Sequence, residues 1–150
     1  MIEIAKIGFI GAGGNAQGHM QRVAELPGAR IAAVCDVAAD RAEAAAAKYG
    51  AKAYTQYERM LGEEDLHAVY VSVPPFAHYD AEILAAERGL HLFVEKPVAL
   101  TLEKGLEIWE AIAKAEPLET ALQRVPASEA GRKAKPSAQT PDDDDRKPSL

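Results

Sequence analysis

Residues 7–20 read IGFIGAGGNAQGHM, and this stretch decides the fold class of the chain. The apolar run over residues 4–10 predicts a buried strand, and residues 14–26 have the pattern of a helix that Pro27 and Gly28 end. Between the two lies the pattern G-x-G-x-x-[G/A]. The pattern alone is weakly specific, but a strand before it and a helix after it are the context in which it binds phosphate groups.

Each small residue of this motif has a physical role. Gly11 permits the tight turn after the strand, and Gly13 leaves the backbone open to a pyrophosphate. Ala16 lets the helix pack close to the sheet. Gly14 and Asn15 belong to the first helical turn, where backbone N–H groups and the positive end of the helix dipole face an anion. We therefore predict that these five residues bind the phosphates of a dinucleotide.

The chain continues to residue 115 as short apolar runs in alternation with helical patterns. Further strands are expected at 30–35, 52–55, 68–73 and 91–94, and helices at 38–49, 56–61, 76–88 and 101–115, the last with Thr101 as N-cap. Such alternation predicts a parallel sheet with right-handed crossovers and helices on both faces. We therefore predict an α/β fold, a doubly wound parallel Rossmann sheet of order 3-2-1-4-5.

Composition divides the chain into two parts. Residues 116–150 hold five of the nine prolines and the acidic run Asp142 to Asp145, with few apolar residues. Such a segment cannot bury enough surface to offset its ordering entropy. We expect a dinucleotide-binding Rossmann domain over residues 1–115, then a largely disordered tail over 116–150 and no second domain. The aspartate run is interpreted as solvated rather than as a metal site, and no metal site is predicted.

Charge and hydropathy exclude several classes of function. The net charge of −6 argues against nucleic acid and against an anionic membrane surface. No apolar run approaches the roughly 20 residues of a membrane-spanning helix, and the start of the chain lacks the pattern of a signal peptide. One cysteine excludes an internal disulfide. We expect a cytoplasmic protein.

Asp36 ends the second predicted strand, about 20 residues beyond the glycine motif. A dinucleotide fold places an acid there to accept hydrogen bonds from the adenosine ribose. This predicts NAD as cofactor, because a carboxylate would repel the 2′-phosphate of NADP. Arg41 lies nearby, so NADP is a minor alternative as cofactor. The alternative to a ribose-binding role is that Asp36 is simply a solvated residue at the end of the strand. Cys35 is expected to be a small buried apolar residue.

A rigid turn follows the fourth strand, in VSVPPFAHYDAEIL (residues 71–84). Pro74 and Pro75 end the strand and stiffen the turn, and together with Val73 they are predicted to bind the cofactor. The predicted strand order sets this turn beside the glycine turn, where it can hold one face of a nicotinamide ring. His78 either contacts cofactor or substrate or serves a local structural bond, and the sequence leaves both open. His19, on the first helix, is predicted to be a packing residue.

The fifth strand ends in FVEKPVAL (residues 93–100), at the same edge of the sheet. Lys96 there can hydrogen-bond a substrate hydroxyl or carbonyl, polarise it and pass a proton as hydride moves, so it is the predicted catalytic residue. Glu95 is predicted to position the lysine or the cofactor, and Pro97 to fix the turn, with a cis bond as one option. An exposed Glu-Lys pair without function is the alternative.

The glycine motif, Asp36, SVPPFAH (72–78) and VEKPVALT (94–101), in this order, resemble the N-terminal half of the glucose–fructose oxidoreductase / inositol dehydrogenase (Gfo/Idh/MocA) family. The resemblance covers about residues 4–115. It implies an NAD(P)-binding domain, then a second domain that supplies most of the substrate pocket and usually the subunit contacts. It also implies hydride transfer between a nicotinamide cofactor and a sugar or polyol-type alcohol, with Lys96 as the substrate-binding lysine.

No counterpart of the second domain follows, so the chain is expected to be a truncated member whose own activity is uncertain. The alternative is a non-catalytic NAD(H)-binding or subunit-interaction module, which would associate through exposed apolar surface. Trp109 and Ile112 are candidates for this surface, although we expect both to pack in the core. A methyltransferase using S-adenosylmethionine shares the glycine turn and the acid after the second strand. The Pro-Pro turn and VEKP speak against it, because they suit a nicotinamide site.

Overall fold

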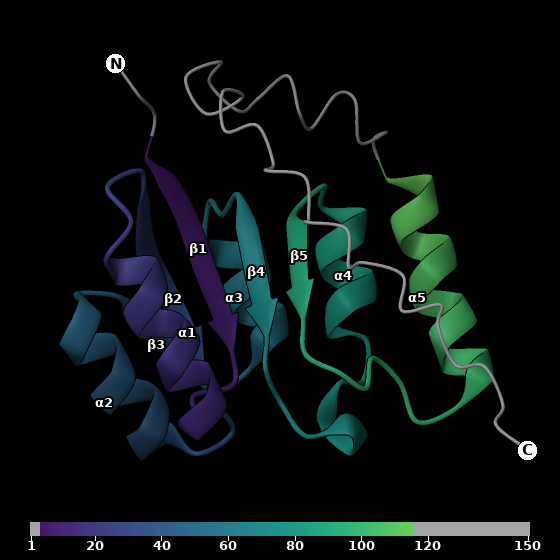
Figure 1. The fold of residues 1–150 in the computed structure, drawn as a ribbon, viewed down its shortest axis with the longest axis horizontal. Coiled ribbons are helices and arrows are strands. Elements are labelled where there is room, and N and C mark those ends of the chain that lie inside the picture. The colour runs from purple at the N-terminus through teal and green to yellow at the C-terminus, as the bar shows by residue number, and fades with distance from the viewer. Residues whose placement is uncertain (1–3, 116–150) are drawn as a thin grey trace, which may run out of the picture.

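The computed structural model describes residues 4–115 (Figure 1). Five strands of this part of the chain form a parallel sheet in the order β3-β2-β1-β4-β5. Their bounds are β1 (Ala5–Ile10), β2 (Ala29–Cys35), β3 (Lys52–Tyr54), β4 (Ala68–Val71) and β5 (His91–Val94). The predicted doubly wound sheet and its strand order are confirmed. The predicted tail over 116–150, with its aspartate run, lies outside the described residues.

Helices cover both faces of the sheet (Figure 1). Figure 1 shows α1 (Gly14–Ala24) and α2 (Ala39–Tyr49) on one face and α3 (Tyr57–Glu63) and α4 (Ala81–Glu87) on the other, while α5 (Leu102–Lys114) packs against α4 beyond the β5 edge. One core cluster, which includes Phe9 and Met20, lies between α1 and the sheet. A second, which includes Met60 and Val69, lies between the sheet and helices α3 and α4. Within residues 4–115, no helix has the length and apolar character needed to cross a bilayer.

Local sequence explains where two of the helices begin and end. Gly50 follows α2 in the left-handed conformation with φ 66°, which glycine adopts without steric cost. Thr101 precedes α5, and its hydroxyl accepts a 3.2 Å hydrogen bond from the backbone N–H of Lys104. The predicted N-cap is therefore confirmed, and it satisfies one of the N–H groups that the first turn leaves without a partner.

The predicted helix over 76–88 is wrong in its first half. A short 3-10 helix, η1 (Pro75–Ala77), comes first, and α4 begins only at Ala81. Tyr79 separates the two with φ 47°, a conformation that an α-helix cannot include. Strand β4 also ends at Val71 rather than at residue 73, because Pro74 and Pro75 have no N–H to donate to a neighbouring strand.

Strand register creates a row of aromatic rings across the α1 face of the sheet. Phe9 pairs with Tyr70, and Tyr70 pairs with Phe93. The rings stack, with centroids 4.8 Å apart in the first pair and 4.5 Å in the second. Figure 1 shows no helix of the described part of the chain over β5 on this face, and Phe93 is 45% exposed. The row therefore runs from the core under α1 to an open edge.

Candidate functional site

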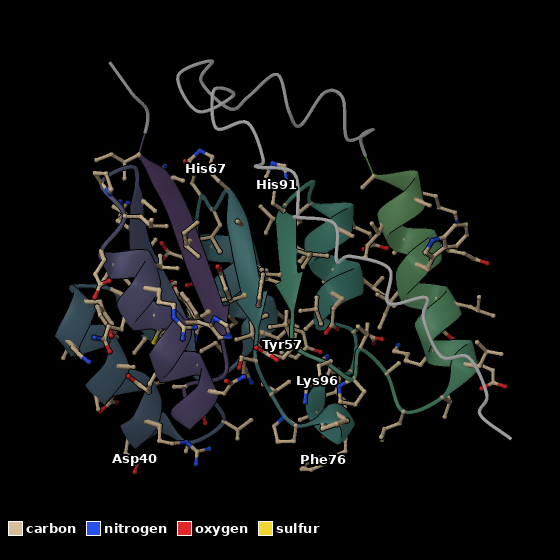
Figure 2. All side chains as sticks on the ribbon, in the orientation of Figure 1. Asp40, Tyr57, His67, Phe76, His91 and Lys96 are labelled. Carbon is tan, nitrogen blue, oxygen red and sulfur yellow. The ribbon has the colours of Figure 1, made fainter. Side chains whose placement is uncertain are left out.

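The predicted site residues gather at the carboxyl edge of the sheet. Figure 2 shows Lys96 beyond the end of β5 and Phe76 in the turn after β4, both at this edge. His67 and His91 lie at the opposite edge, beside the starts of β4 and β5 (Figure 2). Ligands of doubly wound sheets bind at the carboxyl edge where the strand order reverses, which is here between β1 and β4.

Gly11 makes the turn between β1 and α1 possible. Its φ is 100°, and a Cβ atom on it would lie 2.2 Å from the carbonyl oxygen of Ser72. Its N–H donates to the carbonyl of Cys35 at 2.8 Å, so the turn is held by β2 on one side and by the end of β4 on the other. Only glycine has both the conformation and the volume that this position requires.

The start of α1 is open where a phosphate would approach. A Cβ atom on Gly13 would have no neighbour within 4 Å, and no side chain caps the helix. Gly14 and Asn15 are exposed, whereas Ala16 is fully buried against the sheet. The N–H groups of the first turn have no acceptor within a helix, so they are free to bind an anion. The predicted roles of these residues fit this geometry.

Asp36 ties the end of β2 to the glycine turn. Its Oδ2 accepts a 2.9 Å hydrogen bond from the backbone N–H of Ala12, and its Oδ1 accepts one of 2.9 Å from Ala38. The residue is 8% exposed. Burial acts to raise the pKa of the carboxyl, but the hydrogen bonds from Arg41 and from the two backbone N–H groups outweigh it and lower the pKa below its ordinary value. Asp36 is therefore an anion at neutral pH.

The structure places Arg41 beside Asp36. The sequence had offered Arg41 only as a minor alternative, as a residue for NADP binding. The guanidinium donates two hydrogen bonds to Oδ1 of Asp36, of 2.8 Å from Nη2 and 3.2 Å from Nε. Arg41 lies in the first turn of α2, so it reaches back over the strand end. Asp36 therefore has a cation beside it, and the five-residue spacing between the two residues was the only signal of this pair in the sequence.

The turn after β4 contacts the glycine turn. Val73 Cγ1 would lie 3.0 Å from a Cβ atom on Gly11, which places the two turns side by side as predicted. Pro74 is exposed, and Pro75 opens η1. This pair of turns forms the junction between β1 and β4, where the nicotinamide half of a dinucleotide is predicted to lie.

His78 points into the protein rather than to solvent. Its Nδ1 pairs with Oε1 of Glu82 one helical turn later, and the two side chains are 3% and 0% exposed. Oε2 of Glu82 is buried with no hydrogen-bond partner among the described residues. The sequence did not single out Glu82, although an i, i+4 His-Glu pair was visible in it. The pair fixes the segment that contains Tyr79, and a cofactor role of His78 stays a prediction.

Glu95, Lys96 and Pro97 follow β5 at the same edge. The Lys96–Pro97 bond is cis, the option that the sequence left open. The backbone N–H of Glu95 donates to the carbonyl of Val71 at 2.9 Å, which continues the β4–β5 ladder, and Lys96 is exposed. Figure 2 places Lys96 at the edge that the glycine turn also occupies. Its catalytic role stays a prediction.

His19 does more than pack. Its Nε2 donates a 2.6 Å hydrogen bond to Oε1 of Glu95, and its ring lies against Tyr70 and Phe93. The pKa of Glu95 lies below its ordinary value. The bond from His19 is the largest cause, and the Asn15 side chain is the second. The sequence prediction of a packing residue was therefore incomplete, because only the fold brings the His19 side chain to Glu95.

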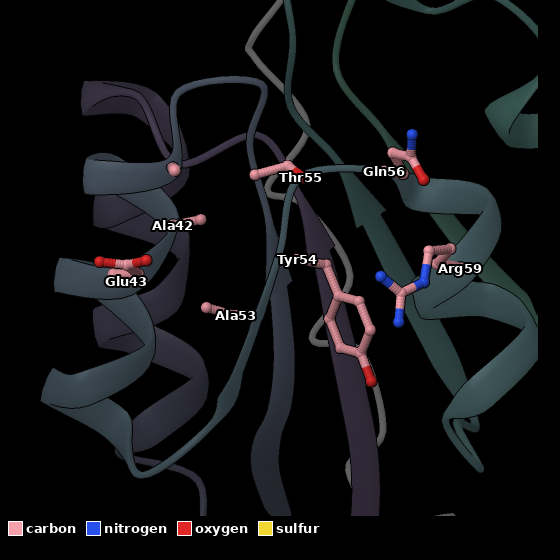
Figure 3. Close-up of a pocket in the computed structure, with 8 residues that line it drawn as sticks. Ala42, Glu43, Ala53, Tyr54, Thr55, Gln56 and Arg59 are labelled. Carbon is pink, nitrogen blue, oxygen red and sulfur yellow. The ribbon is translucent and has the colours of Figure 1, made fainter.

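A separate groove lies between α2, β3 and α3 (Figure 3). Its volume is ≈ 170 Å³, and the side chains around it include Glu43, Tyr54 and Arg59. Figure 3 shows Tyr54 between the two helices. No predicted site residue is among those that line the groove, so the candidate dinucleotide site does not depend on it.

Comparisons with known proteins agree with this geometry. A model described as an oxidoreductase family with an NAD-binding Rossmann fold, GFO_IDH_MocA, matches residues 5–120. Inositol 2-dehydrogenase of Salmonella paratyphi B is 34% identical over 112 residues, which are 73% of this chain and 33% of that protein. A glycosyl hydrolase family 109 protein of Streptomyces coelicolor is 35% identical over 122 residues, 74% of this chain and 25% of that protein. The chain thus spans about a third or less of the length of these relatives.

Solved structures show the same fold. Myo-inositol dehydrogenase from Lactobacillus casei, solved in complex with NAD(H) and myo-inositol, superposes with a TM-score of 0.67 at 33% sequence identity. The superposition covers 72% of this chain and 33% of that one. The described residues thus correspond to one part of a larger protein of this kind.

Proposed function

The chain belongs to the Gfo/Idh/MocA oxidoreductase family, as its motifs indicated, and from this premise we propose that residues 4–115 bind NAD at the carboxyl edge of the sheet. One observation carries the proposal: the anionic Asp36 carboxylate is bonded to the backbone of the glycine turn. An acid in this place can accept hydrogen bonds from the adenosine ribose while the adjacent helix start binds the pyrophosphate. NAD fits better than NADP, because the 2′-phosphate would approach a carboxylate.

The residues present fit the cofactor at three points. The first turn of α1 has no capping side chain, Gly13 leaves room beside it, and Val73 stands next to Gly11 across the β1–β4 junction. The helix start and Gly13 would hold the pyrophosphate, and Val73, the neighbour of Gly11 in the second turn, would lie against one face of the nicotinamide. When bound, NAD supplies the capacity to accept or release hydride.

For the larger protein we propose hydride transfer between this cofactor and a sugar or polyol-type alcohol. The names of the relatives, inositol 2-dehydrogenase and myo-inositol dehydrogenase, support this substrate class. In this chain Lys96 would bind the substrate oxygen and stabilise the charge that develops on it, with Glu95 and Pro97 setting its position. The residues that select the substrate would come from a second domain. We also propose that the protein is located in the cytoplasm.

The decisive experiment is a fluorescence titration of the purified full chain with NADH and with NADPH. We expect saturable NADH binding and weaker NADPH binding. Lys96→Ala is expected to leave NADH affinity within about threefold of wild type, because the lysine faces substrate rather than the phosphates. A folded wild-type chain that does not bind NADH would contradict the proposal, and tighter binding of S-adenosylmethionine would support the methyltransferase alternative.

A subunit-interaction module is the second candidate, and the surface of α5 favours it. Trp109 and Ile112 are exposed, so the expectation that both pack in the core is wrong. Leu102 and Leu106 are exposed as well, and with Trp109 they have the i, i+4, i+7 spacing of one helical stripe. Contiguous apolar surface of this kind favours association, here with a second copy of the chain. Light scattering at rising concentration should show a dimer that Trp109→Glu dissociates, whereas a monomer at all concentrations would exclude self-association.

A further inference from the structure

Glu95 connects two parts of the candidate site that are 76 residues apart in sequence. Its carboxylate accepts a 2.6 Å hydrogen bond from Nε2 of His19 on α1. The bond is partly shielded, because the two side chains are 16% and 23% exposed. Hydrogen bonds to a carboxylate are stronger than neutral ones, and shielding from water strengthens them further.

Two residues of α1 converge on this carboxylate. Asn15 and His19 are one helical turn apart, so their side chains lie on the same face of the helix. His19 bonds the Glu95 carboxylate, and Asn15 is a further cause of the lowered pKa of that carboxyl. Since α1 begins at the glycine turn, the bond from His19 connects the predicted pyrophosphate site to the end of β5.

The other ends of the connection are also held. The backbone N–H of Glu95 is bonded to Val71 in β4, so the carboxylate projects from a fixed strand end. The His19 ring contacts Tyr70 at 5.5 Å and Phe93 at 5.2 Å between centroids, which limits its rotation. Lys96 is the next residue after this fixed point, so a displacement of Glu95 would displace it as well.

We propose that His19 is a positioning residue that, through Glu95, sets the spacing between the glycine turn and the Glu95–Lys96–Pro97 segment on the nicotinamide side of the dinucleotide site. This proposal rests on the proposed NAD binding. It states that the hydrogen bond between His19 and Glu95 sets the width of the site at its nicotinamide end. The adenosine end, at Asp36, lies on the β2 side of the glycine turn and does not depend on it.

The variants His19→Phe and His19→Gln separate hydrogen bonding from packing. Phenylalanine keeps an aromatic ring against Tyr70 and Phe93 but has no donor, whereas glutamine places an amide N–H near the position of Nε2. His91→Phe is the matched control, because His91 is an exposed histidine at the opposite edge of the sheet. Thermal unfolding of each full-length variant establishes that it is folded.

Affinities for NADH and for ADP, which lacks the nicotinamide half, form the test. We expect His19→Phe to weaken NADH binding about tenfold, the effect of losing one charge-assisted hydrogen bond. ADP affinity should stay within about twofold, and His19→Gln should recover most of the NADH affinity. Unchanged NADH binding in His19→Phe, equal losses for NADH and ADP, or no recovery by a folded His19→Gln would each overturn the proposal.

A double-mutant cycle keeps this test independent of NAD binding. In the absence of ligand, Glu95→Gln and His19→Phe should each lower the folding equilibrium constant, and the double variant should lose no more than the larger single loss. Losses that multiply independently would show that the two side chains do not act together and would overturn the proposal. If the cycle shows the coupling but the folded wild-type chain binds no NADH, the result would instead contradict the proposed function.

Discussion

The carboxylate of Asp36 accepts a 2.9 Å hydrogen bond from the backbone N–H of Ala12, and this bond joins the end of β2 to the turn that follows β1. The same carboxylate accepts two bonds from Arg41. One buried acid thus stabilises the turn, and the same acid is predicted to bind the adenosine ribose. Its two tasks can be separated by experiment.

Asp36→Asn should weaken NADH binding about tenfold or more, because the amide loses the charge that strengthens the ribose hydrogen bonds. It should also lower the free energy of unfolding at neutral pH. The pKa of Asp36 is lowered by folding, so the ionised carboxylate favours the folded state. That contribution is present above the ordinary aspartate pKa of about 3.9 and is lost as the pH falls through the folded pKa.

Urea unfolding of wild type and Asp36→Asn from pH 7 to pH 3 measures this effect. The difference in stability should shrink on acidification. Asp40→Asn, at an exposed carboxylate in the first turn of α2, is the control for the loss of one negative charge. A difference that stays constant with pH would contradict the assignment of the stabilisation to the Asp36 anion.

Arg41→Ala should change the preference between cofactors. The guanidinium offsets part of the Asp36 charge and is bonded to the acid beside which a 2′-phosphate would lie. We expect the variant to lose NADPH binding by about tenfold while NADH binding changes less than about threefold. Titration with both nucleotides, with Arg59→Ala on α3 as control, measures it. Equal changes for the two nucleotides would assign Arg41 a structural role only.

Gly11→Ala should destabilise the fold strongly. The methyl group would meet the Ser72 carbonyl, and φ 100° is unfavourable for alanine, so we expect a loss of about 3 kcal/mol. Gly13→Ala is the matched variant, because its methyl group would enter open space. It should fold normally yet bind NADH more weakly. Thermal unfolding and titration distinguish the two, and equal stability of the two variants would contradict the geometry of the turn.

Cys35 should resist alkylation in the folded protein. Burial first, and then the charge of Asp36, raises the pKa of its thiol to about 12, and the thiolate is the reactive form. Iodoacetamide at pH 8 should therefore label the chain only when it unfolds. Because this is the single cysteine, mass spectrometry gives an unambiguous count. Rapid labelling under native conditions would show that the end of β2 opens to solvent.

Glu82→Ala should cost about 3 kcal/mol of stability, because it leaves the buried His78 without its partner. Glu87→Ala, on the exposed face of the same helix, should change stability by less than about 0.5 kcal/mol. Urea unfolding of both variants gives the comparison. A stable Glu82→Ala variant would mean that His78 finds another partner or water.

The sequence by itself determined the features that depend on short stretches of chain. Alternating apolar runs and helical patterns predicted the parallel sheet and its strand order, because each βαβ unit has one hand and one direction. Gly11, Asp36 and Lys96 could be placed at one edge by the same reasoning, since each follows a strand. The N-cap at Thr101 needed only the local pattern.

Only the tertiary structure decided which side chains bond one another at that edge. The pairs His19–Glu95 and Arg41–Asp36 depend on how far each helix crosses the sheet, and only the fold shows that the locally spaced pair His78–Glu82 is buried. Periodicity fixes the face on which a residue lies but not the distance to a group on another element. That distance follows from the packing of the whole domain. Packing leaves little empty volume, and it leaves few buried polar groups without a hydrogen-bond partner.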